Sequence, residues 1–185
     1  MTPFPRRVRR IVSVWGLAAG AFLATLAGLA AAFRSELPPP AGEVELGVAA
    51  PEVELVGDSG PVSFRKELEG HASVVLLFRG SWCPYCRREL GRLSDGVRRQ
   101  PMDGVRVMGI SADPPDGLAD LRRKLGLPFP LFSDREDRTA AICHFAMHCA
   151  LLYDPRGVLR WAGYAENWRA PLDYTAILLA ARRLR

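Results

Sequence analysis

The chain has 185 residues, of which 25 are basic and 20 are acidic, and its formal net charge is +5. Five of the basic residues are arginines within residues 1–34, which contain no acidic residue, so the rest of the chain is electrically balanced. This distribution excludes a nucleic-acid-binding domain of the basic type, and we expect no nucleic acid among the partners.

The N-terminus combines a basic cluster with a long uncharged run. Residues 1–10 contain four arginines, and residues 11–33 contain no charged residue. A run of this length is sufficient to cross a bilayer as a helix, and flanking arginines keep their side in the cytoplasm. We therefore expect a basic cytoplasmic segment, 1–10, and a single-pass anchor in the cell membrane, 11–33, with the remainder on the periplasmic side. The alternative is a cleaved signal peptide, because the alanines at 30–32 offer a cleavage site.

Residues 34–45 form the predicted linker, since three consecutive prolines at 38–40 favour a stiff, extended backbone. Residues 46–185 have the length of one domain. In its first part, residues 53–56 alternate as a strand does, a turn follows, and residues 62–64 are expected to return as a hairpin. A short helix is expected at residues 64–69.

Residues 74–78 read Val-Val-Leu-Leu-Phe, a continuous apolar run typical of a central strand buried on both faces. A turn at residues 79–82 leads to the sequence Cys-Pro-Tyr-Cys at 83–86 and then to leucines at helical spacing. Pro84 suits the first position of a helix, which places Cys83 at the N-cap. Gly91 and Gly96 argue against a helix longer than one or two turns, because each glycine costs about 1 kcal/mol relative to alanine.

A cysteine at a helix N-terminus has a particular chemistry. Unpaired backbone N–H groups and the helix dipole favour its thiolate, which is the attacking species in disulfide exchange. We therefore predict that Cys83 is the nucleophile and that Cys86, one turn further on, resolves the mixed disulfide. This requires a Cys83 sulfur that solvent and a partner can reach. The alternatives for the pair are a zinc site and a plain structural disulfide.

The remaining chain continues the alternation of strands and helices. We expect strands at residues 105–110, 150–153 and 158–162, with a turn at 154–157 between the last two. Helices are expected at 118–125, ending near Gly126, at 135–145, and from Pro171 to the arginines at the C-terminus. This order predicts an α/β domain with a mixed central sheet and helices on both faces.

The stretch from Leu46 to Leu90, together with residues 158–169, resembles the redoxins of the AhpC/TSA (peroxiredoxin-like) and membrane-tethered thioredoxin-like group. The matching pieces are LGVAAPEVEL, VVLLF, RGSWCPYCRREL and VLRWAGYAENWR. The resemblance implies a thioredoxin-like fold over residues 46–185, with an extended segment at residues 127–132. It also implies a redox-active cysteine pair without an organic cofactor or metal. Its partners would be protein thiols and disulfides, or peroxide, with a membrane or extracytoplasmic protein as electron donor.

Several residues are candidates for lining the site. The resemblance implies that Trp82 covers the edge of the site, with Pro84 and Tyr85 between the cysteines. Arg79 is placed to stabilise a thiolate by its charge, or else is a solvated strand end. Glu89 stands six residues after Cys83, off its helical face, so we expect it to be solvated, although related redoxins use a buried carboxylate in proton transfer.

A second pair, Cys143 and Cys149, allows three interpretations: a structural disulfide, a redox relay with Cys149 near the first pair, or a metal site with neighbouring histidines. The alignment implied by the resemblance puts His148 or Cys149 where thioredoxin folds carry a cis-proline. His148 is therefore either a ring beside Cys83 that supplies charge or a proton, or a loop residue without a role.

Peroxiredoxins carry the pattern PxxxTxxC. If Cys86 is aligned with their reactive cysteine, Cys83 replaces the threonine, and the hydroxyl that positions peroxide is missing. The sequence therefore favours a membrane-anchored thiol-disulfide oxidoreductase. The alternatives are a thiol peroxidase using the same cysteines and a copper-delivery protein on a thioredoxin fold, whose motif has three residues between the cysteines.

Overall fold

One mixed sheet organises the computed structural model, which describes residues 44–100, 102–143, 148–164 and 171–185. Within these residues the strand order is β2-β1-β5-β4-β3-β6-β7. β3 pairs in parallel with β4, and β4 with β5, whereas the other neighbours are antiparallel. The strands are β1 (Glu54–Gly57), β2 (Gly60–Ser63), β3 (Ala72–Phe78), β4 (Val105–Ser111), β5 (Leu131–Ser133), β6 (His148–Tyr153) and β7 (Leu159–Tyr164).

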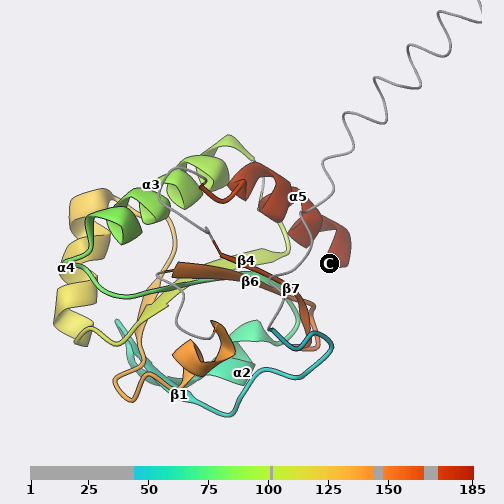
Figure 1. Cartoon of the computed structure of the whole chain (residues 1–185), viewed down its shortest axis with the longest axis horizontal. Helices are drawn as coiled ribbons and strands as arrows, with labels where there is room; N and C mark the ends of the chain where they lie inside the picture. Colours follow the sequence, from blue (N-terminus) through green and yellow to red (C-terminus); the bar gives the residue numbers. More distant parts are fainter. Residues whose placement is uncertain (1–43, 101, 144–147, 165–170) are drawn as a thin grey trace, which may run out of the picture. The chain divides into compact units, whose positions relative to one another are not determined.

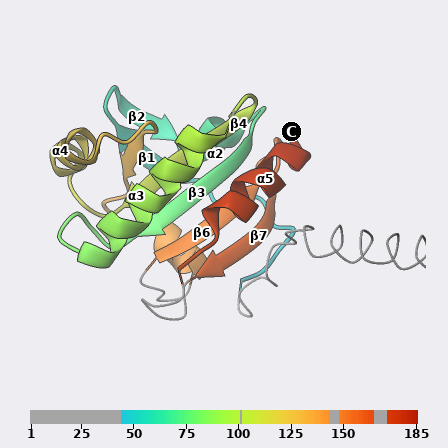
Figure 2. The same cartoon turned by 90° about the horizontal axis from the view of Figure 1, so that it is seen from above.

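Helices cover both faces of the sheet, as Figures 1 and 2 show. One face carries α3, α4 and α5, and the other carries α2 and the short 3-10 helix η1. The mixed sheet between two helical layers confirms the predicted fold class. The helices are α2 (Phe64–Leu68), α3 (Pro84–Arg99), α4 (Pro115–Leu125), η1 (Thr139–Cys143) and α5 (Tyr174–Leu184).

The central strand β3 is buried along its whole length, as its apolar run predicts. Because side chains alternate along a strand, Val74, Leu76 and Phe78 pack in the core under α3 and α5. Val75 and Leu77 pack in the core on the α2 face. Each face of the sheet therefore has its own apolar core. The chain leaves β3 at Phe78 and enters α3 at Pro84.

The helix α3 is longer than the sequence suggested, since it runs through both of its glycines to Arg99. Gly96 is buried, and a Cβ atom there would lie 2.9 Å from Cδ1 of Leu178 in α5. A side chain at position 96 would thus push the two helices apart. The cost of glycine in the helix is offset by the close packing that it permits.

The region after β5 differs from the prediction of a helix at 135–145. Only Thr139–Cys143 is helical, as 3-10 turns, and Phe145 lies outside the described residues. The Asp134 carboxylate accepts hydrogen bonds from the backbone N–H and the hydroxyl of Thr139, at 2.6 and 2.7 Å. Asp137 has a positive φ of 53°, which interrupts a regular helix before it forms.

Other predicted elements match with shifted ends. The hairpin of β1 and β2 and the short helix α2 are confirmed, and α4 ends at Gly126 in the left-handed conformation. The last helix begins at Tyr174, later than Pro171, because the Asp173 side chain caps it by accepting the N–H of Ala176. The extended segment before Ser133 ends as β5, which adds a strand to the sheet.

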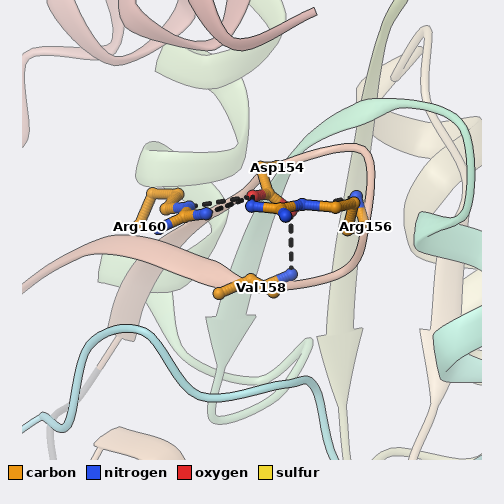
Figure 3. A network of polar contacts seen from close by, with 4 residues as sticks. All are labelled: Asp154, Arg156, Val158 and Arg160. Atoms are coloured by element: carbon orange, nitrogen blue, oxygen red, sulfur yellow. Dashed lines mark hydrogen bonds and ion pairs between the residues drawn. The ribbon is translucent and has the colours of Figure 1, made fainter.

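The turn between β6 and β7 is held by Asp154 (Figure 3). Its carboxylate accepts hydrogen bonds from the backbone N–H groups of Arg156 and Val158 and from the Arg160 guanidinium. Burial raises the pKa of Asp154, but these hydrogen bonds and the charge of Arg160 outweigh it, so the pKa is lowered. The predicted turn at 154–157 is confirmed.

The predicted anchor, residues 11–33, and the linker lie outside the described residues. Within the part of the chain that is described, no helix combines the length and apolar character needed to cross a membrane.

Candidate active site

The helix α3 begins at the cysteine pair. Cys83 is its N-cap residue in an extended conformation, and Pro84 opens the first turn, as predicted. The Cys83 sulfur accepts a hydrogen bond from the backbone N–H of Cys86, at 3.5 Å. Both sulfurs are reduced. The pair is thus held in one turn at the end of β3, with a backbone N–H group directed at the first sulfur.

Cys83 itself is only 3% exposed, contrary to the expectation of an open nucleophile. The reason is the tight turn before the helix, in which the N–H of Cys83 bonds to the carbonyl of Gly80 at 3.2 Å. This turn directs the side chain of Cys83 into the core under α3 rather than out to solvent. A partner sulfur can therefore reach Cys83 only after the neighbouring surface is displaced.

Cys86 is fully buried one turn below. Burial is the main cause that raises its pKa to about 12, and the neighbouring Cys83 adds to the effect. Cys86 therefore stays protonated at neutral pH. The roles of Cys83 as nucleophile and Cys86 as resolving cysteine stay predictions.

Aromatic rings and arginines surround the pair on the outside. Trp82 is 63% exposed, and the Arg79 guanidinium lies 5.0 Å from the centre of its ring. Tyr85 is paired in the same way with Arg88, at 5.3 Å. Arg79 thus stacks on Trp82, whereas the sequence suggested that it stabilises a thiolate or is a solvated residue at the end of the strand. Pro84 is also exposed, so the surface around Cys83 is apolar and basic.

The turn that carries Trp82 is held by Asp113, which lies between β4 and α4 and which the sequence did not single out. The Asp113 carboxylate accepts the backbone N–H of Ser81 at 2.5 Å. Asp113 is itself held by Ser133, whose hydroxyl donates to its carbonyl at 2.7 Å. Gly80 is required here, because a Cβ atom would overlap the Trp82 ring and lie 2.8 Å from Asp113 Oδ1.

Glu89 is buried, at 5% exposure, so the expectation of a solvated carboxylate is wrong. The relevant spacing is from Cys86, not from Cys83: residues three apart share a helical face, so Glu89 follows Cys86 into the core. Its Oε1 accepts a hydrogen bond from Arg92 at 3.1 Å, while Oε2 has no hydrogen-bond partner. The spacing of Glu89 from Cys86 would have predicted that its side chain is buried.

His148 lies on the same face of the sheet as the cysteine pair. It opens β6 and pairs with Phe78, the last residue of β3, whose side chain is in the core under α3. The described residues contain no cis peptide bond, and the residue before His148 lies outside them. The ring is buried, which makes it a core residue beside the site and not a loop residue at the surface.

Cys143 and Cys149 form a disulfide, as the first of the three interpretations proposed. Both belong to the core on the α2 face, opposite the core that contains Cys83 and Cys86. This arrangement does not favour the relay. Within the described residues there is also no group of three or more His, Cys, Asp or Glu side chains that is arranged to hold a metal ion.

Comparison with known proteins gives a consistent picture. The AhpC/TSA family matches residues 46–162. Peroxiredoxin Q of Oryza sativa subsp. japonica is 28% identical over 97 residues, covering 52% of this chain and 45% of that protein. Thiol-disulfide oxidoreductase ResA of Geobacillus kaustophilus is 27% identical over 93 residues, covering 45% and 53%. The chain thus spans about half the length of these curated relatives.

Among solved structures, peroxidoxin BcpB from Mycobacterium tuberculosis matches with a TM-score of 0.65 and 19% identity, covering 77% of this chain and 99% of that one. Likeness at this identity shows the fold, which is thioredoxin-like, as the resemblance implied. The family match covers most of the chain and includes β3 and α3, the strand and the helix between which the cysteine pair lies. This protein therefore belongs to the AhpC/TSA family.

Proposed function

We propose that the domain is a thiol-disulfide oxidoreductase that cycles Cys83 and Cys86 between dithiol and disulfide. The observation that carries this proposal is the N-cap position of Cys83, with its sulfur accepting the N–H of Cys86 at 3.5 Å. A helix N-terminus stabilises a thiolate over a thiol, and the thiolate is the nucleophile of disulfide exchange. The names of the relatives, peroxiredoxins and a thiol-disulfide oxidoreductase, support the class.

The reaction comprises two exchange steps. The Cys83 thiolate attacks one sulfur of a partner disulfide, forming a mixed disulfide and expelling the partner's other sulfur as a thiolate, which takes a proton from solvent. Cys86 then loses its proton and attacks the Cys83 sulfur, so the Cys83–Cys86 bond forms and the partner's second thiolate leaves. Two electrons pass to the partner, and the reverse sequence oxidises a partner dithiol.

The second step requires a base, because the pKa of Cys86 is about 12. Glu89, one turn further along the buried face of α3, is the carboxylate placed to accept this proton. The use of a buried carboxylate in related redoxins supports the same role here. Trp82 and the turn behind it are the surface that a docking partner displaces to uncover Cys83.

We also propose that the domain acts outside the cytoplasm, tethered by residues 11–33, and that a membrane or extracytoplasmic protein supplies its electrons. The arginines before the apolar run support this orientation. The Cys143–Cys149 disulfide supports it too, because structural disulfides persist in oxidising compartments.

Reduction of insulin disulfides tests the exchange activity. Wild-type protein with a dithiol donor should precipitate insulin chains, Cys83→Ser should be inactive, and Cys86→Ser should accumulate a mixed disulfide with the substrate. Equal activity of wild type and Cys83→Ser would overturn the proposal.

A thiol peroxidase is the second candidate, favoured by the peroxiredoxin names among the relatives. The full burial of Cys86, which stands where the peroxidatic cysteine would align, weighs against it. Stoichiometric peroxide separates the two: a peroxidase forms the Cys83–Cys86 disulfide rapidly and turns over with a reductant, whereas a dedicated exchange enzyme reacts as slowly as a free thiol.

A further inference from the structure

The start of α3 and the turn before it form an exposed surface around the cysteine pair, which we call the basic aromatic patch. Its members are Arg79, Trp82, Pro84, Tyr85, Arg87 and Arg88, all of which are exposed. Trp82 and Tyr85 are two of the five large apolar side chains that are exposed among the described residues. Aromatic side chains and arginine are the residue types enriched in protein interfaces, so the composition of the patch suits the docking of another protein.

The arginines of the patch have no acidic partners in the described part of the chain. No ion pair there joins Arg79, Arg87 or Arg88 to a carboxylate, although arginines on α2, β4 and α4 do form such pairs. Asp113 contacts the same turn, but its carboxylate accepts the backbone N–H of Ser81 at 2.5 Å. The three guanidinium charges of the patch are therefore available to a binding partner.

The position of two of these arginines is unfavourable for the helix that carries them. The N-terminal end of a helix dipole is positive, so this end favours acidic side chains and disfavours cations. The first turn of α3 contains no acidic residue, and Arg87 and Arg88 follow directly after the cysteine pair. By contrast, Arg98 and Arg99 at the C-terminal end of α3 suit the dipole. Local stability thus explains the second pair of arginines but not the first.

Aromatic rings hold two of the guanidinium groups in place. The Arg79 guanidinium carbon lies 5.0 Å from the centre of the Trp82 ring, and that of Arg88 lies 5.3 Å from the centre of the Tyr85 ring. Stacking on a ring leaves the charge and the planar edge of a guanidinium free to bind a carboxylate through two hydrogen bonds. One such pair precedes Cys83 in the chain and the other follows it.

We propose that the basic aromatic patch docks an acidic polypeptide segment, which carries the disulfide or dithiol that exchanges with Cys83. Aspartate and glutamate side chains beside the partner's cysteines bind Arg79 and Arg88, while its apolar side chains pack on Trp82 and Tyr85. Charge complementarity of this kind selects an acidic segment over a neutral or basic one. The inference deepens the proposed function and rests on it, because it names the chemistry of the exchange partner.

Rings and arginines also suit a membrane surface. The patch surrounds the sulfur that a partner has to reach, which favours a polypeptide as its occupant. Hydrogen exchange of residues 79–88 in the full-length chain distinguishes the two. Slower exchange in phosphatidylglycerol nanodiscs than in phosphatidylcholine nanodiscs would assign the patch to the lipid and overturn the proposal, whereas equal exchange is the result expected.

The first test compares three synthetic peptides that contain the same disulfide flanked by glutamate, glutamine or lysine. Their reduction by the full-length chain in phosphatidylcholine nanodiscs is measured at low and high salt. At about 20 mM salt the glutamate peptide should react about tenfold faster than the glutamine peptide, and the lysine peptide about tenfold more slowly. At about 0.5 M salt the three rates should converge, because salt screens exposed charges. Equal rates for the glutamate and glutamine peptides at low salt would overturn the proposal.

The second test removes the two stacked charges. In Arg79→Gln with Arg88→Gln, the ratio of the glutamate rate to the glutamine rate should fall to about one. The ratio is the readout because a change in the reactivity of Cys83 itself alters both rates alike. The matched control, Arg99→Gln with Arg183→Gln, removes two exposed arginines from the C-terminal ends of α3 and α5 and should keep the wild-type ratio. A ratio that the first variant retains would contradict the proposal.

A binding measurement separates this inference from the proposed function. A fluorescently labelled glutamate peptide without cysteine should bind the wild-type chain, and bind Arg79→Gln with Arg88→Gln about tenfold more weakly, as followed by anisotropy. If this binding is observed but no disulfide peptide is reduced, only the proposed function fails. If all three disulfide peptides are reduced at one rate and the cysteine-free peptide does not bind, the inference alone fails.

Discussion

Cys86 and Glu89 lie one turn apart on the buried face of α3, so a thiol and a carboxylate occupy the same apolar interior. Both side chains are removed from bulk solvent. The chemistry of the second cysteine is therefore tied to its helical neighbour, and several measurable properties follow from this burial.

Alkylation should distinguish the two cysteines. In the reduced protein, iodoacetamide near pH 8 should modify Cys83 slowly, because its surface must first open, and Cys86 should remain unmodified, because its pKa is about 12. Mass spectrometry of peptides after timed quenching measures both. A Cys83 that stays unmodified until urea is added would mean that it is sealed, and the exchange mechanism would have to be abandoned.

The same burial makes the stability of the reduced domain depend on alkaline pH. The folded pKa of Cys86 is raised from 9.0 to about 12, so the stabilisation is complete below about pH 9. As pH rises from about 9 to about 12, the unfolded chain gains from ionising and the folded state does not, so the reduced domain should lose stability. Thermal unfolding measures this, and Cys86→Ala should show a weaker loss. A wild-type midpoint that does not fall in this range would contradict the raised pKa.

The two glycines of α3 should respond oppositely to alanine. Gly91 has no atom within 4 Å of an added Cβ, so Gly91→Ala should stabilise the domain by about 0.5–1 kcal/mol. Gly96→Ala should destabilise it, by about 1–3 kcal/mol, because its Cβ lies 2.9 Å from Leu178. Chemical denaturation of the two variants tests this. Stabilisation by both would show that α5 can shift to accommodate a side chain at position 96.

Asp113→Ala should loosen the turn before the cysteines, because the turn is hydrogen-bonded to the Asp113 carboxylate. Loss of the hydrogen bond from Ser81, made to a charged group, should lower kcat/KM for insulin about tenfold. The exposed Asp116, nearby on α4, provides the control, and Asp116→Ala should leave the rate within about twofold. Equal effects of the two variants would mean that the hydrogen bond between Ser81 and Asp113 does not contribute to activity.

Asp154→Asn should destabilise the β6–β7 turn by about 2 kcal/mol, because hydrogen bonds to a carboxylate are replaced by weaker ones. The lowered pKa of Asp154 also sets a direction with pH. Its contribution is complete above the unfolded pKa, about 3.9, and is lost as pH falls through the lower folded value. The difference between wild type and Asp154→Asn should therefore shrink below about pH 4, and a difference that stays constant would contradict this.

Local patterns in the sequence were sufficient for most of the fold. The apolar run of β3, Pro84 after Cys83 and the turn at Asp154 each specify their structure through neighbouring residues. What could not be predicted depends on contacts between distant segments. Gly96 is tolerated because of α5, and Asp134 turns the chain toward η1 by capping Thr139.

The site shows the same division. The N-cap position of Cys83 follows from Pro84, but its burial depends on the fold of the whole turn. The burial of Glu89 was available from its spacing to Cys86. The position of His148 was not, since it arises from the register of β6 on β3.

The sheet divides the sulfur chemistry of this domain into two insulated compartments. Cys143–Cys149 is buried on one side, and Cys83 and Cys86 occupy the other. If the proposed function holds, an electron donor that docks over Trp82 would reduce the Cys83–Cys86 disulfide without contacting Cys143–Cys149, because the sheet lies between the two pairs. The cross-link of the scaffold would then persist during turnover.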